Sequence, residues 1–306
     1  MFSTKLNQKI LKKNSRACIG LDPRLEWLPE NIVSAAVKNH GKTFAAAGEA
    51  ITAFNKQVID VVAEYVPVVK PQMAFYEQYG PAGLQAFWDT VTYAKEHDLL
   101  VVSDAKRGDI DSTAQAYANS LLGTTNLFET ETKVYDVDCV TINPFLGEDS
   151  LIPFIETCHK HGKGIFVLAK TSNPGSDDLQ NLVVNGQTIS TIVASMIAKH
   201  AEQSTDSNGY SSIGAVVGAT FPEEARQLRK QLPHSIFLVP GIGAQGGDTS
   251  GLGNFFNSDG LGAIVNSSRG VTFSKKGKEG KDYLKLIEQE TKSLVAAINA
   301  GMSHKE

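Results

Sequence analysis

The chain has 306 residues, of which 42% are hydrophobic and 20% are charged, and its formal net charge at pH 7 is -4. This composition excludes a disordered chain, and the lack of a basic excess argues against a nucleic-acid partner. No run of about 18 apolar residues occurs, so we expect no membrane span. The N-terminus carries lysines but no continuous apolar stretch, so we expect no signal peptide and a cytoplasmic protein.

Eight short apolar runs, each followed by a polar turn and a segment of helical period, predict βα units around a parallel sheet. The predicted strands cover 17–21, 66–70, 100–104, 138–143, 164–170, 213–218, 236–240 and 263–266. The predicted helices cover 48–65, 83–97, 150–161, 188–203, 222–231 and 282–300, and another begins near 111–113. Eight units are typical of a (β/α)8 barrel, so we predict an α/β chain with one barrel domain over 1–306.

Two predicted connections are long, at 22–47 and 171–187, and loops of this length are usually functional or mobile. Polar side chains follow four of the predicted strands, namely Asp22, Lys70, Asp104 with Lys106, and Ser172. Asp104 and Lys106 are two residues apart and should point the same way, with Ala105 opposite. Barrel enzymes place their active sites at the carboxyl ends of the strands. Titratable groups at one rim therefore predict an active site there.

The loops after the seventh and eighth strands predict a phosphate site. Four glycines at 241–247 allow backbone N–H groups to approach an anion closely. The run 266–270, Asn-Ser-Ser-Arg-Gly, supplies hydroxyls and the guanidinium of Arg269. These two loops frequently bind phosphate in barrels of this class, so we expect a phosphorylated ligand.

The cysteines and histidines form no metal or redox motif. Three scattered cysteines are too few for a disulfide framework, and Cys18 and Cys139 lie in strand-like runs that predict core positions. His159 and His161 lie at a polar helix end with no third ligand nearby, and we interpret them as surface residues. We therefore expect no metal site and no cofactor.

Six motifs together resemble the orotidine 5'-monophosphate decarboxylase family, and most closely its longer, mainly bacterial type 2 branch. The motifs are GLDP, VVKPQ, DAKRGDI, LAKTSNPGS, PGIGAQGGD and IVNSSRG, and the resemblance runs from about residue 17 to residue 270. It implies a (β/α)8 barrel that works as a homodimer with active sites at the subunit interface. The implied reaction converts orotidine 5'-monophosphate to UMP and CO2 in pyrimidine biosynthesis, without metal or cofactor.

The resemblance also implies roles for individual residues. Lys70, Asp104, Lys106 and Asp109 would form an alternating array, in which Lys106 protonates C6 of the substrate and Asp109 reaches the partner subunit's site. Thr113 would accompany Asp109 across the interface. The remaining implied roles are ribose binding by Asp22, recognition of the pyrimidine edge by Ser172, and phosphate binding by Gln245, Gly246 and Arg269.

Two alternatives remain open. Related barrel enzymes use a similar DxKxxD motif with Mg²⁺ and act on sugar phosphates through an enediolate, but they place an acidic metal ligand at the end of the second strand. Lys70 occupies that position here and is a poor metal ligand when charged. A nucleotide-binding barrel without catalytic activity is compatible with the fold, but it would not need Lys106 between two acids.

Overall fold

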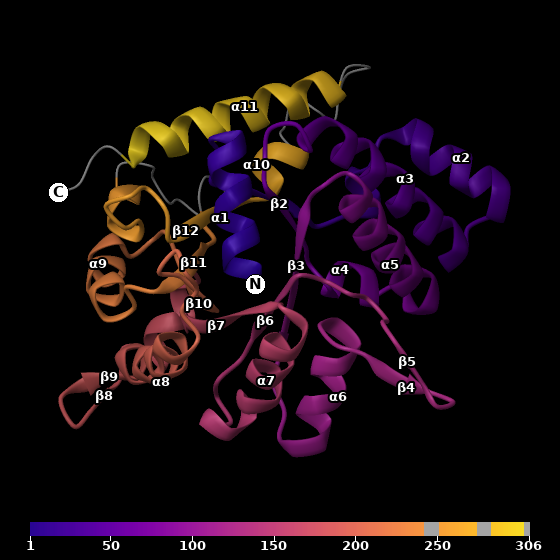
Figure 1. Cartoon of the computed structure of the whole chain (residues 1–306). Helices are drawn as coiled ribbons and strands as arrows, with labels where there is room; N and C mark the ends of the chain where they lie inside the picture. The colour runs from indigo at the N-terminus through magenta and orange to yellow at the C-terminus, as the bar shows by residue number, and fades with distance from the viewer. Residues whose placement is uncertain (242–250, 274–282, 303–306) are drawn as a thin grey trace.

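The computed structural model describes residues 1–241, 251–273 and 283–302. Within these ranges, eight parallel strands form a closed barrel in chain order, with the last strand pairing back to the first (Figure 1). The strands are β1 (Ala17–Leu21), β2 (Val68–Pro71), β3 (Leu100–Arg107), β6 (Cys139–Ile142), β7 (Gly164–Lys170), β10 (Ser211–Val217), β11 (Ser235–Val239) and β12 (Ala263–Ser267). The predicted (β/α)8 barrel is confirmed.

The strands are buried on both faces, as parallel strands covered by helices must be. Alternate side chains therefore belong to two cores, one inside the barrel and one between the barrel and the helices. Cys18 and Cys139 belong to the inner core, which confirms their predicted positions. All three cysteines are buried and free.

The outer layer consists of α3 (Phe44–Val62), α5 (Gly80–Glu96), α6 (Asp111–Leu121), α7 (Ile152–His161), α8 (Ile189–Gln203), α9 (Pro222–Gln231) and α11 (Tyr283–Gly301). All of the predicted helices are present, with ends that move by a few residues. Helix α3 begins four residues before its predicted start because Thr43 Oγ1 accepts a hydrogen bond from the Ala46 N–H. On α11, Ile287 and Ile298 are buried, and their separation of about three helical turns places them on the same face.

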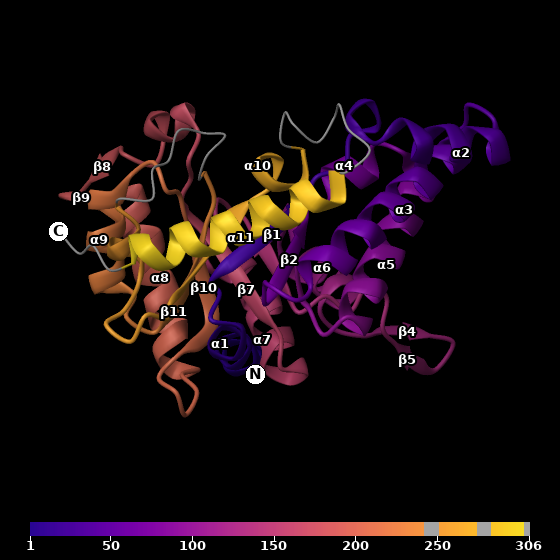
Figure 2. The same cartoon turned by 90° about the horizontal axis from the view of Figure 1, so that it is seen from above.

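Helix α1 (Phe2–Lys13) was not predicted, and it closes the amino-terminal end of the barrel (Figures 1 and 2). Phe2, Leu6 and Ile10 are buried in the inner core. The Phe2 ring meets Phe166 edge to face at 6.0 Å between centroids. At Gly164, a Cβ atom would lie 2.5 Å from the Phe2 ring, so glycine is required for this close packing. The inner core is therefore sealed at the end opposite the carboxyl ends of the strands.

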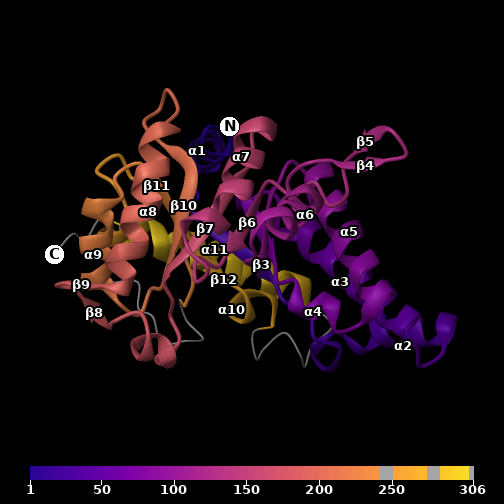
Figure 3. The same ribbon diagram turned by 90° about the horizontal axis from the view of Figure 1, so that it is seen from below.

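The two long connections contain short elements. The first holds the 3₁₀ helix η1 (Leu25–Trp27) and α2 (Glu30–His40), and the second holds η3 (Pro174–Asp178) and the hairpin of β8 (Val183–Val184) and β9 (Gln187–Thr188). A second hairpin, β4 (Thr125–Leu127) with β5 (Thr130–Thr132), projects from the opposite side of the barrel (Figure 3). In the described ranges no helix has the length and apolar character needed to cross a membrane.

Candidate active site

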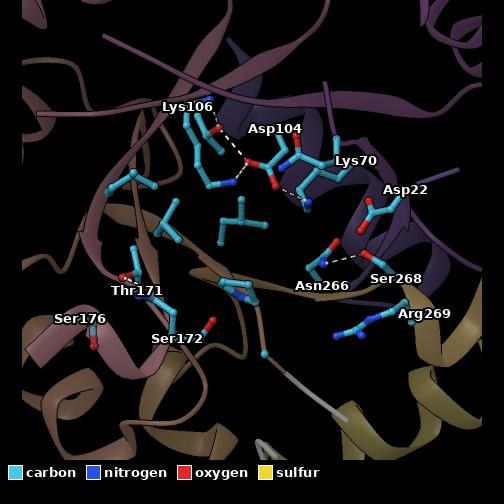
Figure 4. Close-up of a pocket in the computed structure, with 18 of the residues that line it drawn as sticks. Asp22, Lys70, Asp104, Lys106, Thr171, Ser172, Ser176, Asn266, Ser268 and Arg269 are labelled. Atoms are coloured by element: carbon cyan, nitrogen blue, oxygen red, sulfur yellow. Dashed lines mark hydrogen bonds and ion pairs between the residues drawn. The ribbon is translucent and has the colours of Figure 1, made fainter. Parts of the chain in front are cut away.

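A cavity of about 700 Å³ opens at the carboxyl ends of the barrel strands. Figure 4 shows its polar side chains converging from strands far apart in the sequence. Six of the ten residues predicted for the site line this cavity, namely Asp22, Lys70, Asp104, Lys106, Ser172 and Arg269. The rim predicted from the strand ends is therefore a single pocket.

Lys70, Asp104 and Lys106 form a continuous chain of charges across neighbouring strands β2 and β3 (Figure 4). Asp104 Oδ2 lies 2.6 Å from Lys70 Nζ, and Asp104 Oδ1 lies 2.6 Å from Lys106 Nζ. Lys70 is 4% exposed and Asp104 is 9% exposed, whereas the Lys106 side chain is 45% exposed on the pocket side. Ala105 packs against the outer core, which confirms the predicted alternation.

Both buried members of this chain are charged at neutral pH. Burial by itself would lower the pKa of Lys70, but the charges of Asp104 and Asp22 and the hydrogen bond to Asp104 outweigh burial and raise it above the ordinary value. For Asp104, burial alone favours the neutral acid. The charges of Lys70 and Lys106 and their hydrogen bonds outweigh that effect and hold the pKa of this carboxyl well below its usual range.

An irregular end of β3 aims Lys106 into the pocket. The predicted strand ends at residue 104, but β3 continues to Arg107 with a register shift against β6 between Ser103 and Arg107. Lys106 has φ 47°, a left-handed conformation that is costly for a side chain other than glycine. The Lys106 N–H donates to Thr141 Oγ1 at 3.0 Å, and that hydroxyl donates to Asp104 Oδ1 at 3.0 Å. Thr141 therefore connects the strained backbone to the charged array.

Thr141 was not among the predicted site residues. It is the polar residue of β6, a strand that otherwise contains Cys, Val and Ile. A hydroxyl in an otherwise apolar strand of the barrel is the signal that could have identified it.

Two buried oxygens beside the charged array have no hydrogen-bond partner among the described residues. They are Asp22 Oδ1, just after β1, and Asn266 Oδ1, on β12, and both residues line the pocket. Buried polar atoms are almost always paired in folded proteins, so these two acceptors are available to a ligand that carries hydroxyl or N–H groups. The sequence predicted Asp22 as a binding residue but gave no role to Asn266.

Arg269 stands where β12 gives way to the short helix α10 (Arg269–Thr272). This segment passes so close to β1 that a Cβ atom at Gly20 would lie 1.9 Å from Ser268 Oγ. Glycine at position 20 therefore allows Ser268 and Arg269 to stand at the mouth of the pocket (Figure 4). Pro240 and Gly241 line the same mouth, whereas Gln245 and Gly246 lie outside the described residues.

Ser172 lies across the pocket from Asp22, with Thr171 and Ser176 beside it (Figure 4). Its backbone rests against β10, since a Cβ atom at Gly218 would lie 2.8 Å from the Ser172 N and Cα atoms. The Gln180 side chain pairs with both the backbone and the side chain of Thr171 across this loop. The Thr171 N–H donates to Gln180 Oε1 at 2.9 Å, and Gln180 Nε2 donates to Thr171 Oγ1 at 2.8 Å. The loop that forms this wall of the pocket is therefore held together by hydrogen bonds between Thr171 and Gln180.

Asp109 and Thr113 do not line the pocket of their own chain. Asp109 Oδ1 accepts a hydrogen bond from the Ile110 N–H at 2.9 Å, just before α6, and Thr113 is exposed in the first turn of that helix. Helix α6 begins at Asp111, inside the predicted range. The expectation that Asp109 and Thr113 act in a partner's site remains a prediction.

The described side chains include no group of three or more His, Cys, Asp or Glu residues that could hold a metal ion. His159 is exposed and His161 is partly exposed at the end of α7, in agreement with the predicted surface positions. Lys70, rather than an acid, stands next to the last residue of the second barrel strand. The pocket thus offers ammonium groups for proton donation and anion binding, together with a carboxylate that repels an anion placed beside it.

Comparison with known proteins places these motifs in one family. A family model described as the orotidine 5'-phosphate decarboxylase / HUMPS family matches residues 15–283. The chain is 46% identical over 278 residues to an orotidine 5'-phosphate decarboxylase of Rhodopirellula baltica, covering 91% of this chain and 90% of that one. It is 39% identical over 302 residues to the orotidine 5'-phosphate decarboxylase of Caldicellulosiruptor saccharolyticus, covering 99% of each. The solved structure of Leishmania donovani OMP decarboxylase has 33% identity and a TM-score of 0.74, covering 99% of both chains.

Proposed function

We propose a mechanism from the premise that the chain belongs to the orotidine 5'-phosphate decarboxylase / HUMPS family and is a carboxy-lyase. The substrate is orotidine 5'-monophosphate, and the products are UMP and CO2, a step of pyrimidine biosynthesis. The reaction uses no metal and no cofactor, so the charged side chains of the pocket supply the catalysis. The observation that carries this proposal is the chain of Lys70, Asp104 and Lys106 within the pocket, joined by contacts of 2.6 Å.

Lys106 is the proton donor in this mechanism. Loss of CO2 from C6 leaves an electron pair on a ring carbon with no adjacent carbonyl group to delocalise it. The Lys106 ammonium stands beside C6, stabilises the developing negative charge, and then gives its proton to C6 as the new C–H bond forms. The paired carboxylate of Asp104, 2.6 Å away, keeps this ammonium in place before the substrate binds.

Asp104 lies near the substrate carboxylate in this arrangement. Its negative charge repels the ground state more than a transition state in which the carboxylate becomes neutral CO2. Lys70 donates a hydrogen bond to Asp104, lowers the pKa of this buried carboxyl and so keeps it ionised. The two lysines therefore have different roles, with Lys70 maintaining the array and Lys106 reacting.

Contacts far from C6 must supply much of the rate acceleration. An ion pair at 4 Å contributes about 4 kcal/mol at an effective dielectric constant of 20, whereas enzymes lower barriers by about 8 to 23 kcal/mol. We assign the phosphate to Arg269 with Gln245 and Gly246, the ribose hydroxyls to Asp22, and the pyrimidine edge to Ser172. These contacts hold the ring against Lys106 and exclude water from the charged array.

A homodimer with shared active sites would give Asp109 and Thr113 a role, although neither residue lines the pocket of its own chain. Both residues lie beside Ile110, which is 48% exposed, and Phe145 after the neighbouring strand β6 is 75% exposed. The segments of these apolar residues are adjacent, because the Asn143 N–H donates to the Arg107 carbonyl. We propose that this surface meets a second copy of the chain and that Asp109 and Thr113 enter the partner's pocket. The free, buried cysteines favour a cytoplasmic location.

The direct test of this function is incubation of the purified chain with orotidine 5'-monophosphate, with and without EDTA. The absorbance of the substrate should fall at the same rate in both samples while UMP forms in equal amount. A reaction that stops in EDTA would favour a metal-dependent relative, and the absence of UMP would contradict the assigned reaction.

A further inference from the structure

Lys170, the last residue of β7, is fully buried but does not line the pocket. Its Nζ atom lies 2.7 Å from Asn181 Oδ1 and 3.2 Å from Asp177 Oδ1. The same atom lies 4.1 Å from the centre of the Phe221 ring. Removing an ammonium from water is costly unless it gains partners of this kind, so a lysine here needs a reason beyond packing.

Of the two oxygen partners, Asp177 lies in η3 and Asn181 lies in the segment that follows η3. Asn181 Nδ2 also donates to Asp177 Oδ1 at 2.6 Å, so the ammonium, the carboxylate and the amide form one closed set of contacts. These contacts join the end of the strand to residues seven and eleven positions further along the chain. Lys170 therefore fixes the far end of the loop to the barrel.

The next residue makes a parallel connection on the pocket side of the loop. Thr171 pairs with Gln180 through two hydrogen bonds, while Lys170 binds Asn181, so consecutive residues of the strand end hold consecutive residues of the returning chain. Between these points the loop presents Ser172 and Ser176 to the pocket. The Lys170 contacts thus lie directly behind the wall that faces the proposed position of the pyrimidine ring.

We propose that Lys170 is a positioning residue for the pyrimidine end of the substrate, an inference that rests on the proposed function. It acts through Asn181 and Asp177 by holding the loop that carries Ser172. Arg269 begins α10, after a different strand, on the opposite part of the pocket mouth (Figure 4), so the phosphate end is independent of this anchor. Loss of Lys170 should therefore weaken ligands that carry the base and spare ligands that consist of the sugar phosphate alone.

The test compares Lys170→Met with wild type using two ligands. We expect the KM for orotidine 5'-monophosphate and the dissociation constant of UMP each to rise about tenfold, the size expected from loss of one charge-assisted contact. The inhibition constant of ribose 5-phosphate should stay within about twofold of the wild-type value. Lys170→Arg should recover part of the lost UMP affinity. Lys199→Met is the matched control, because Lys199 forms an exposed ion pair with Glu148, and it should leave all constants unchanged.

Asn181→Leu provides the same test without a change in the core, should Lys170→Met fail to fold. It removes the 2.7 Å contact to Lys170, so UMP affinity should fall while ribose 5-phosphate inhibition persists. Wild-type UMP affinity in these variants would overturn the positioning role, as would an equal loss of both ligands. A wild-type protein that forms no UMP from orotidine 5'-monophosphate would instead overturn the proposed function.

Discussion

Replacing Asp104 with asparagine removes the carboxylate that contacts both lysines of the pocket. The side chain keeps its shape, so the change isolates the charge. Lys70, which is 4% exposed, then holds a buried ammonium whose paired carboxylate is gone. Lys106 is less affected, because its side chain is 45% exposed and water can solvate the ammonium. We expect Asp104→Asn to be inactive and clearly less stable than wild type.

The distance sets the size of this effect. Two unit charges 2.6 Å apart, as in Lys70 and Asp104, attract by about 6 kcal/mol at an effective dielectric constant of 20. Asparagine retains an oxygen that can accept the Lys70 hydrogen bond, and Asp22 still raises the pKa of Lys70. Removing one partner of a buried pair costs about 3 to 5 kcal/mol, and we expect a loss near the lower value, about 3 kcal/mol.

Chemical denaturation at pH 7 measures this loss, and thermal denaturation should show a melting temperature about 5 °C lower. A second variant, Lys70→Met combined with Asp104→Asn, removes the unpaired ammonium. It should regain most of the lost stability, because apolar replacements of buried ion pairs are often neutral, while remaining inactive. A free energy of unfolding for Asp104→Asn within about 0.5 kcal/mol of wild type would refute the reasoning.

The ion pair of Lys70 and Asp104 also predicts how the stability of the protein depends on pH. The pKa of Asp104 is lowered in the fold, so its carboxylate stabilises the protein above the unfolded value of about 3.9, and this contribution disappears as the pH falls through the lowered pKa. The difference in unfolding free energy between wild type and Asp104→Asn should therefore narrow below about pH 4. The pKa of Lys70 is raised in the fold, so its ammonium group stabilises the protein below the unfolded value of about 10.4. This contribution disappears as the pH rises through the raised pKa.

Four further variants test individual residues of the site. Lys106→Ala should abolish UMP formation but still bind UMP in calorimetry, and retained turnover would contradict its role as proton donor. Arg269→Ala should lower kcat/KM mainly through a higher KM, and an unchanged KM would remove it from the phosphate site. Asp109→Ala should be inactive alone, and mixing it with Lys106→Ala should restore about a quarter of wild-type activity through mixed dimers; no recovery after subunit exchange would argue against shared sites. Gly218→Ala places a Cβ atom 2.8 Å from the Ser172 backbone, so it should raise KM and cost about 1 to 3 kcal/mol of stability, which denaturation can check.

The barrel could be predicted because each strand is a short apolar run followed by a helical period. Strand ends were less predictable. The run 100–104 reads as a strand that stops at Asp104, but hydrogen bonds to β6 extend β3 to Arg107 through a backbone irregularity at Lys106. Helix α1 was not predicted, because its lysines interrupt the apolar pattern, although Phe2, Leu6 and Ile10 repeat every four residues and are buried. The apolar face of this helix is buried only by packing against the open end of the barrel, and this tertiary contact is not visible in the local sequence.

The site was predictable where residue type and strand position coincide. Lys70, Asp104 and Lys106 lie in the carboxyl-terminal halves of β2 and β3 and meet in one pocket, as expected. Thr141 and Asn266 were given no role from the sequence, because the role of each depends on its surroundings in the folded barrel. Thr141 matters through its contact with Asp104, and Asn266 through a buried oxygen that finds no partner among the described residues. Such relations exist only after the strands have closed.

The position of Lys106 relative to a bound pyrimidine nucleotide tests the central claim most directly. A crystal structure of the protein with UMP should show Lys106 Nζ about 3 to 3.5 Å from C6 of the ring, close enough to have delivered its proton. Asp104 should remain paired with the same nitrogen. A structure in which Lys106 Nζ faces bulk solvent, away from C6, would contradict the mechanism.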